Sequence, residues 1–447
     1  MEETLTRAGS LPTDGHELTI AQEGLWVLQK FQPDRCADNV TGAWRLHFPV
    51  DVSRLSTAVS RTISRHALLH SVFRVESGRV CRFAAQGRVP ALDEYRIDEI
   101  PDMDARRFVQ EQGRRPFQLD QEPPVRIALL RDGTADDILL VVAHHIVMDD
   151  LSTLLFLREV LTQYVDAHKA ADMPRRFGAG IDELVRGEQS YLSSPRAAAA
   201  RDYWREELTQ GAVGVDQPTD HPRPAAYRAE GSEIQFWLDH KLTEGVRRAA
   251  VSKKATPFAY YLTAFHRLLH QESGRTDFII GYPVTLRSAR RFRNSIGHFV
   301  NVLPMRVLVD PDESFTSALR RTTEKLWGGL RHRDFPYAMM PALLRTQRDP
   351  RSLGLVSCTF GMNAESIASP YFDMLLPDRR VEHAGLNISR LHVPVFPGQF
   401  DMTLNLSQHG ADVFAELRYN TSLYVDETAH RMADNYVRIL EKAVSND

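Results

Sequence analysis

Stretches with helix-like and strand-like spacing of hydrophobic residues alternate along the whole chain of 447 residues. Residues 55–66 place apolar side chains at positions 55, 58, 59 and 63, a spacing typical of one helix face. Residues 138–143 form an uninterrupted apolar run with several β-branched members, which predicts a strand buried on both faces. A second helical stripe follows, formed by Leu154, Leu157, Leu161 and Tyr164. These patterns predict a mixed α/β protein.

The second half of the chain carries the same mixture of patterns. A helix is predicted over 257–271. Strands are predicted at 277–281, 299–309, 356–362, 400–406 and 413–419. The chain ends in an amphipathic helix whose apolar face contains Ala429, Met432, Ala433, Tyr436 and Leu440. Two α/β halves of similar size follow from these patterns.

Residues 172–218 differ in composition from both halves. They contain the turn at Gly178–Gly180 and the alanine run Ala197–Ala200. We interpret this segment as a crossover and place the domain boundary at this turn, near residue 180. The sequence therefore predicts an N-terminal lobe of residues 1–180 and a C-terminal lobe of residues 181–447.

The charge balance and the cysteine content exclude several classes of partner and setting. Lys and Arg number 55 while Asp and Glu number 58, so the net charge is −3 and no basic field attracts nucleic acid or an anionic membrane. The most apolar stretch, 138–161, is interrupted by charged residues and cannot span a bilayer. Cys36, Cys81 and Cys358 are too scattered for a disulfide framework. With no secretory signal at residues 1–5, these features predict a cytoplasmic protein.

The strongest local signal for chemistry is the string His144-His145-Ile146-Val147-Met148-Asp149. It begins where the buried strand is predicted to end, a place where α/β proteins often carry site residues. A histidine there can reach a substrate, and an aspartate four positions later can hold the turn. Alternatively, both histidines are hydrogen-bonded core residues, and Asp149 or Asp150 only caps the next helix. The local pattern leaves both interpretations open.

Other catalytic motifs are absent from the sequence. It has no GxSxG, GxxxxGK[ST], HExxH or strand-associated GxGxxG pattern, and no cysteines at metal-binding spacing, so no bound metal is expected. A run of arginines could bind a phosphate, but a solvated surface run is the favoured interpretation. Its members are Arg287, Arg290, Arg291 and Arg293. His298, His332 and His392 have no partner pattern of their own.

The segment His144–Asp150 resembles the HHxxxDG motif of the condensation domains of nonribosomal peptide synthetases. Further segments resemble motifs of that family in the same order along the chain: AQEGLW at 21–26, RHALLHS at 65–71, PFQL at 116–119 with Pro123 and Arg126, GYPVTLR at 281–287, IGHFVNVL at 296–303, HRDFPY at 332–337 and LRYNTSLY at 417–424. The resemblance covers nearly the whole chain. On these segments the chain is identified as a member of the family.

The resemblance implies a chloramphenicol-acetyltransferase-like α/β fold, in which two lobes form a V-shaped pseudo-dimer with a tunnel between them. A carrier protein would deliver the donor acyl group as a thioester on its phosphopantetheine arm. The acceptor amine, or less often an alcohol, would enter from the other side. The implied function is that of a monomeric acyltransferase, a condensation enzyme that forms an amide, or less often an ester, in natural-product biosynthesis. Apart from that arm, no cofactor is expected.

The same resemblance implies roles for individual residues. His145 would be the catalytic residue, while His144 and Asp149 would shape the turn, and Asp149 would pair with Arg287. An imidazole, with an ordinary pKa of about 6.5, can accept or orient a proton of the attacking amine. Backbone N–H groups of the turn after His145 are candidates for contact with the oxyanion. Whether the histidine acts as a base or as a positioning group stays open.

Several positions depart from the family pattern. Asp150 replaces the glycine of the histidine motif, and glycine permits a wider range of backbone conformations. The extra carboxylate could cap the next helix, favour the imidazolium form of His145 or partly block the tunnel. Gly24, Ala67 and His70 also replace charged residues of the family motifs. Because His145 is retained, we favour an active enzyme. With no adenylation or carrier segment in the sequence, we expect either a free-standing enzyme or an excised N-terminal domain, and the divergent motifs favour the free-standing one.

Other functions within the superfamily stay open. A coenzyme A-dependent acyltransferase is one alternative, but residues 400–405 do not match the DFGWG motif of the plant-type members. A non-catalytic domain that binds a carrier protein and recruits a tailoring enzyme has its best support in Asp150. An epimerisation domain also has the HHxxxDG motif, but residues 296–303 follow the condensation pattern better. A heterocyclisation domain is excluded because its motif has aspartates in place of the histidines. The sequence does not identify the donor acyl group, the acceptor or the stereochemical preference.

Overall fold

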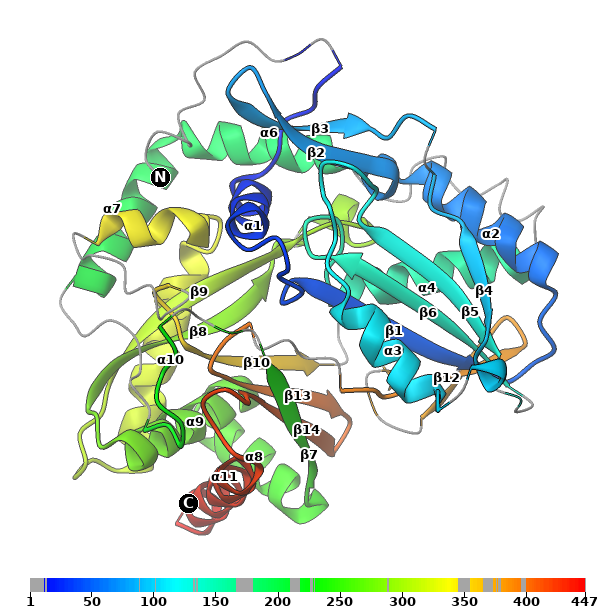
Figure 1. Cartoon of the computed structure of the whole chain (residues 1–447). Coiled ribbons are helices and arrows are strands. Elements are labelled where there is room, and N and C mark those ends of the chain that lie inside the picture. Colours follow the sequence, from blue (N-terminus) through cyan, green and yellow to red (C-terminus); the bar gives the residue numbers. More distant parts are fainter. Residues whose placement is uncertain are drawn as a thin grey trace. The chain divides into compact units, whose positions relative to one another are not determined.

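The computed structural model describes residues 12, 14–87, 89–100, 102–131, 133, 136–165, 180–209, 218–225, 228, 230–287, 289–344, 354–364, 373, 374, 376, 379–394 and 399–446. The chain divides into two compact units, each with its own six-stranded β-sheet (Figure 1). The first unit contains Met1–Tyr191, Thr285–Val300 and Pro370–Val395, and the second contains Leu192–Val284, Asn301–Ser369 and Phe396–Asp447. The predicted mixed α/β fold of two lobes is therefore confirmed.

Both units are discontinuous in sequence, whereas a single boundary near residue 180 is predicted from composition. The difference arises because two later segments pack with the first unit. The strand Leu386–Arg390 joins the first sheet beside Asn39–Leu46, and Arg287 pairs with Asp149 within the same unit. The composition of the chain does not indicate that later segments pack against the first unit, because this packing depends on pairing between residues far apart in the sequence.

The first unit combines a mixed sheet with several helices. Its helices are α1 (Ile20–Phe31), α2 (Val52–Arg65), α3 (Ala105–Arg114), α4 (Asp150–Val165) and most of α6 (Ile181–Leu192). Its strands, in spatial order, are β11 (Arg380–His383), β12 (Leu386–Arg390), β1 (Asn39–Leu46), β6 (Asp137–His144), β5 (Val125–Arg131) and β4 (Leu92–Arg96). Only the β4–β5 pair in this sheet is parallel. A separate hairpin pairs β2 (Ser71–Glu76) with β3 (Arg79–Ala84).

Hydrophobic burial places β6 and α4 in the core of the first unit. Every residue from Ile138 to His144 is buried, as the uninterrupted apolar run predicts for a strand covered on both faces. The helix α4 packs against α2 and β1, and α3 packs against β1 and β6 (Figure 1). The helices predicted at 55–66 and after Asp149 are confirmed as α2 and α4. The turn between β6 and α4 is therefore held by two well-packed elements.

The second unit also has a mixed sheet covered by helices. Its strands, in spatial order, are β7 (Gly231–Leu238), β14 (Asp412–Asn420), β13 (Met402–His409), β10 (Cys358–Ala364), β8 (Asp277–Thr285) and β9 (Val300–Leu308). Its helices are α7 (Pro195–Thr209), α8 (His240–Ser252), α9 (Pro257–Ser273), α10 (Phe315–Arg331) and α11 (Asp426–Ser445). The helices α8, α9 and α11 pack together, and α9 lies against β10 (Figure 1).

The elements predicted in the second half are confirmed with small shifts of their ends. The predicted helices correspond to α9 and α11, and the predicted strands correspond to β8, β9, β10, β13 and β14. The alanine run Ala197–Ala200 lies inside α7, whereas Gly178 of the predicted crossover lies outside the described residues. Among the described helices, none combines the length and the apolar character that a bilayer crossing requires.

Candidate active site

The first of the two adjacent histidines, His144, ends β6 and is completely buried. Its Nδ1 accepts the backbone N–H of Ile146 at 3.0 Å. The ring proton therefore resides on Nε2, which lies 3.3 Å from Oε1 of Gln29. Burial lowers the pKa of His144 to about 4, which keeps the ring neutral near pH 7. Both ring nitrogens hold the turn, and neither is left for a substrate.

His145 begins the turn between β6 and α4 and is less buried than its neighbours. Its backbone N–H donates to the carbonyl of Asp38 at 2.7 Å, which fixes where the residue leaves the strand. The Nδ1 atom of its ring is buried and has no hydrogen-bond partner among the described residues. Leaving such an atom unpaired typically costs about 1–3 kcal/mol and requires an explanation in a native protein. His145 is therefore the candidate reactive side chain of the turn.

A buried ion pair supports the backbone beside His145. Arg35 Nε donates to Asp38 Oδ2 at 2.7 Å, and both side chains are almost fully enclosed. Burial alone would raise the pKa of Asp38, but the charge of Arg35, aided by the two histidines, lowers it to about 2. Asp38 is therefore ionised at neutral pH. No sequence signal identifies this pair, because an arginine and an aspartate three positions apart form no recognisable motif.

Asp149 and Arg287 form a bidentate ion pair at the other end of the turn. Arg287 Nη1 lies 2.6 Å from Oδ2 of Asp149, and Nη2 lies 2.9 Å from Oδ1. The carboxylate of Asp149 also accepts hydrogen bonds from Ser152, whose N–H lies at 2.8 Å and whose hydroxyl lies at 2.7 Å. The N–H of Phe299 donates to it at 3.0 Å. Burial alone would raise the pKa of Asp149, but Arg287 and these donors lower it. Both charged side chains are buried, and the full set of partners offsets the cost of their desolvation.

The same cluster docks the segment 295–299 onto the start of α4. The carbonyl of Gly297 accepts the N–H of Asp149 at 3.2 Å. It also lies 2.9 Å from Oγ of Ser152, whose single proton is shared between this carbonyl and the carboxylate of Asp149. The N–H of Gly297 in turn donates to Ser152 Oγ at 3.1 Å. A Cβ atom on Gly297 would lie 2.8 Å from Cε2 of Phe299, so a larger side chain does not fit without movement. The segment is thus fixed by hydrogen bonds on both sides of residue 298.

This docking brings His298 against His145. The two imidazole rings lie edge to face, with centroids 5.3 Å apart and an interplanar angle of 88°. Burial, together with the nearby His145, lowers the pKa of His298 to about 3, so its ring is neutral at ordinary pH. Its Nδ1, like that of His145, is buried without a hydrogen-bond partner in the part of the chain that the structure describes. The sequence patterns predict no partner for His298, because His145 and His298 lie far apart along the chain and meet only in the folded protein.

Comparisons with known proteins identify the family of this chain. The family model described as Condensation domain matches residues 13–447. The chain belongs to the condensation domain family. Phosphinothricin tripeptide synthetase PhsC of Streptomyces viridochromogenes is 30% identical over 439 residues, which cover 96% of this chain and 39% of that protein. The chain therefore spans less than half the length of this curated relative.

Solved structures of a condensation domain and of an X-domain have the same fold. The first condensation domain of the CDA synthetase matches with a TM-score of 0.78 and 22% identity, covering 97% of this chain and 96% of that one. The complex of the X-domain and OxyB from teicoplanin biosynthesis matches with a TM-score of 0.83 and 21% identity, covering 98% and 95% of the two chains. The chloramphenicol-acetyltransferase-like fold is thereby confirmed. The V shape and the tunnel stay predictions.

Two other motifs of the condensation domain support the turn and the helix after it. In AQEGLW, Nε2 of Gln22 donates to the carbonyl of Ile146 at 2.8 Å. At the start of RHALLHS, Arg65 and His66 lie 2.7 and 2.8 Å from the carboxylate of Glu159 on α4. The first motif therefore holds the turn directly, and the second holds α4.

Four backbone N–H groups at His145 and in the turn after it already make hydrogen bonds within this condensation domain. The N–H of His145 donates to the carbonyl of Asp38, and the N–H of Asp149 donates to the carbonyl of Gly297. The N–H of Ile146 donates to Nδ1 of His144, and the N–H of Val147 donates to the carbonyl of His144. The four distances are 2.7–3.2 Å. Each N–H group would have to break a hydrogen bond before it could donate to a substrate. Three of them, those of Ile146, Val147 and Asp149, belong to the turn in which the oxyanion contact is expected, and the structure does not support the expectation at these three groups.

Asp150, which stands where the family motif has glycine, is exposed and is the first residue of α4. Its backbone is helical, so it needs none of the conformational freedom of glycine. The predicted capping role belongs to Asp149, whose Oδ1 accepts the N–H of Ser152. An exposed carboxylate in the first turn also interacts favourably with the helix dipole.

The predicted run of surface arginines divides into two kinds of residue. Arg287 is buried in the ion pair with Asp149, whereas Arg290, Arg291 and Arg293 are less enclosed. Arg291 Nε lies 2.8 Å from the carboxylate of Glu183. The interpretation as a solvated run therefore holds for the last three and is wrong for Arg287.

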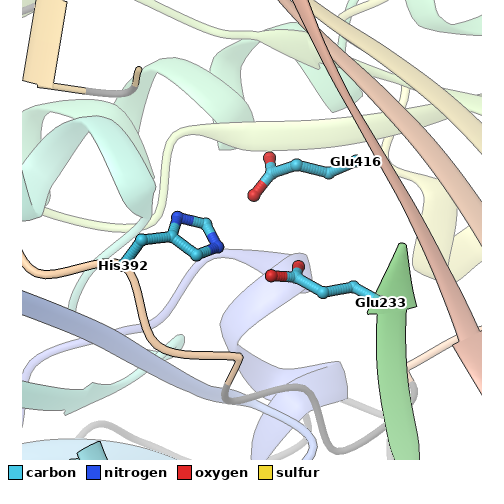
Figure 2. A group of neighbouring side chains, drawn as sticks. All are labelled: Glu233, His392 and Glu416. Carbon is cyan, nitrogen blue, oxygen red and sulfur yellow. The ribbon is translucent and has the colours of Figure 1, made fainter. Parts of the chain in front are cut away.

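Carboxylates that could offer ligand atoms to a cation occur in the second unit. Glu233 on β7 and Glu416 on β14 extend in the same direction and bring carboxylate oxygens within 4.8 Å of one another (Figure 2). His392, also labelled there, belongs to the first unit. Arg418 Nε lies 3.6 Å from Glu233, and its Nη2 lies 3.4 Å from Glu416. The guanidinium of Arg418 offsets one of the two negative charges and lies between carboxylates of neighbouring strands, so we assign the three side chains a structural role in joining β7 to β14.

Proposed function

We propose that this chain is an acyltransferase that joins a carrier-bound acyl thioester to an acceptor amine and forms an amide. The observation that carries the proposal is the placement of His145. From residue 144 to residue 149 it is the one position that is not buried, and ion pairs hold the backbone at both ends of this turn. Membership in the condensation domain family supports the class of reaction.

The proposed reaction is the aminolysis of a thioester. The acceptor nitrogen attacks the carbonyl carbon, the carbon–sulfur bond breaks, and the nitrogen loses a proton. His145 accepts or relays this proton, and the departing thiolate takes up a proton, so the products are an amide and a free thiol. Because Nδ1 of His145 is buried, Nε2 is the atom that we propose faces the substrate. Acid–base help of this kind contributes about 10²–10⁴-fold to a rate.

The other residues of the site are proposed to act by positioning. His144 and Asp149 hold the turn, and Arg287 joins it to the segment 295–299. A histidine held in this way can meet two bound substrates in one fixed geometry, which raises their effective molarity. The phosphopantetheine arm is proposed to come from the carrier protein, so the chain needs no bound cofactor of its own.

The test of this function is product formation from a defined panel of substrates. Acyl-pantetheine and acyl-carrier thioesters are offered together with amines and alcohols, and both the product mass and the released thiol are measured. His145→Ala is compared with the wild type. His430→Ala serves as the matched control because His430 is exposed on α11.

Each outcome of this experiment has one meaning. Amide formed by the wild type and by His430→Ala, but not by His145→Ala, would support the proposal. Product from alcohols alone would assign ester formation, and product from acyl-coenzyme A in preference to acyl-pantetheine would assign the coenzyme A-dependent alternative. Tight binding of acylated carrier without product would favour a recruiting domain. Equal product from His145→Ala and the wild type would overturn the role of His145.

A further inference from the structure

We infer that His298 is a positioning residue of the reaction centre, which holds the imidazole ring of His145 through an edge-to-face contact. The inference deepens the proposed function, because it rests on His145 being the reactive side chain. The family motif to which IGHFVNVL is similar leaves the position of His298 open, so the resemblance gives this side chain no role.

Within the described part of the chain, Nδ1 of His145 does not make the hydrogen bond that usually orients a reactive histidine. In many enzymes the second ring nitrogen donates to a carboxylate or a carbonyl, and this bond fixes both the tautomer and the ring orientation. Here Nδ1 of His145 is buried and has no such partner among the described residues. The orientation of the ring must therefore come from packing.

His298 supplies an aromatic contact of the right geometry. The centroids of the two rings are 5.3 Å apart and their planes are nearly perpendicular, at 88°. This is the arrangement that aromatic pairs prefer, because the positive edge of one ring meets the negative face of the other. A contact of this kind restricts rotation of the His145 ring about its side-chain bonds.

The backbone around His298 is fixed well enough for its ring to serve as a support. Gly297, directly before it, exchanges hydrogen bonds with Asp149 and Ser152. Phe299, directly after it, donates its N–H to Oδ2 of Asp149 at 3.0 Å. Asp149 therefore both ends the turn after His145 and holds the segment that carries His298. One hydrogen-bonded cluster thus positions the two imidazole rings.

The charge state of His298 suits this role. The titratable and charged groups that act on it are His145, Asp149, Asp38 and Arg287. Burial comes first among the causes that lower the pKa of His298, and the ring stays neutral across the neutral pH range. A neutral ring can therefore remain against His145 when His145 takes up a proton, because it adds no like charge.

Two substitutions separate ring contact from other contributions of His298. His298→Ala removes the ring, whereas His298→Phe keeps an aromatic ring and removes the titratable nitrogens. His430→Ala on α11 is the control for loss of a histidine elsewhere. For each variant, kcat and KM are measured with one acyl-pantetheine donor and one amine acceptor, and cooperative unfolding in urea is checked in parallel.

We expect His298→Ala to lower kcat by about 10- to 100-fold, the size of effect that a slightly misplaced catalytic group produces, with both KM values nearly unchanged. His298→Phe is expected to recover most of this loss, and His430→Ala to behave as the wild type. Wild-type kcat in His298→Ala would overturn the inference. A loss in His298→Phe as large as that in His298→Ala would overturn it as well, because a polar atom would then carry the effect.

A second readout tests the contact independently of activity. The ring carbon–hydrogen NMR signal of His145 is identified by its absence in His145→Ala. Because a neighbouring ring shifts this signal, it is expected to move in His298→Ala and to stay near its wild-type position in His298→Phe and His430→Ala. An unmoved signal in His298→Ala would overturn the contact. An inactive wild type would overturn the proposed function, whereas an active wild type unaffected by His298→Ala would overturn this inference alone.

Discussion

The carboxylate of Asp149 and the guanidinium of Arg287, which are 138 positions apart in the sequence, share two hydrogen bonds of 2.6 and 2.9 Å. The pair joins the turn after the adjacent histidines to the segment that carries His298. Ser152 and Phe299 donate further hydrogen bonds to the same carboxylate. Loss of either charge would therefore disturb two segments at once.

Replacing Arg287 with alanine is expected to lower the free energy of unfolding by about 3–5 kcal/mol, because Asp149 would remain as a buried, unpaired carboxylate. Unfolding in urea, followed by circular dichroism, measures this change. Arg291→Ala is the matched control, since Arg291 forms an exposed pair with Glu183 and is expected to contribute less than about 1 kcal/mol. Equal losses in the two variants would contradict the structural role of the buried pair.

Two histidines whose pKa values are lowered in the folded chain are expected to make it sensitive to mild acid. The pKa of His144 is about 4 and that of His298 about 3, against an ordinary value of 6.5. Below pH 6.5 the unfolded chain takes up protons that the folded chain does not, so the free energy of unfolding falls as the pH decreases from 6.5 toward 4. His298→Phe removes one such group and should reduce this slope in urea titrations at a series of pH values. A slope equal to that of the wild type would argue against a lowered pKa of His298 in the folded chain.

Gly297→Ala is expected to destabilise the chain by about 1–3 kcal/mol, because the new methyl group would overlap with the ring of Phe299. A suitable comparison is Gly187→Ala on α6, where nothing lies within 4 Å of the added atom. There the same substitution should stabilise the helix by about 0.5–1 kcal/mol. Thermal and urea unfolding of both variants measure the two effects, and changes of the same sign would refute the predicted close approach at Gly297.

Asp150→Gly restores the residue of the family motif and tests whether the extra carboxylate limits activity. Because the side chain of Asp150 is exposed and its backbone is helical, Asp150→Gly should leave kcat close to the wild-type value. It should lower stability by up to about 1 kcal/mol, since glycine is a poor helix former. Asp150→Ala separates removal of the charge from the flexibility of glycine. A large rise of kcat in both variants would show that the carboxylate obstructs the reaction.

Elements whose burial follows a regular pattern were predicted correctly from the sequence. The strand β6 is an unbroken apolar run, and α9 and α11 each show a clear apolar face. The strand β1 was missed although it is central in the first sheet. In this strand the ring of Trp44 lies against Gly42, where an added Cβ would come within 2.2 Å of that ring. Such packing leaves no periodic signal in the sequence.

The candidate site was only partly visible in the sequence for a related reason. The local string at His144–Asp149 left a catalytic and a core interpretation open, and the resemblance to condensation domains placed Arg287 beside it. The contacts of Asp38, Gly297 and His298 with this turn were not predicted. They join residues that lie far apart along the chain, and neither spacing nor residue type encodes such contacts.

The most direct test of the central claim is a single-turnover measurement with His145→Ala. An acyl-pantetheine thioester and an acceptor amine found for the wild type are mixed with excess enzyme, and amide formation is followed by mass spectrometry. If His145 takes or relays the proton of the acceptor, the rate should fall by about 10²–10⁴-fold, while the midpoint of unfolding stays close to that of the wild type. A rate equal to that of the wild type, in a folded variant, would contradict the assignment of His145 as the reactive residue.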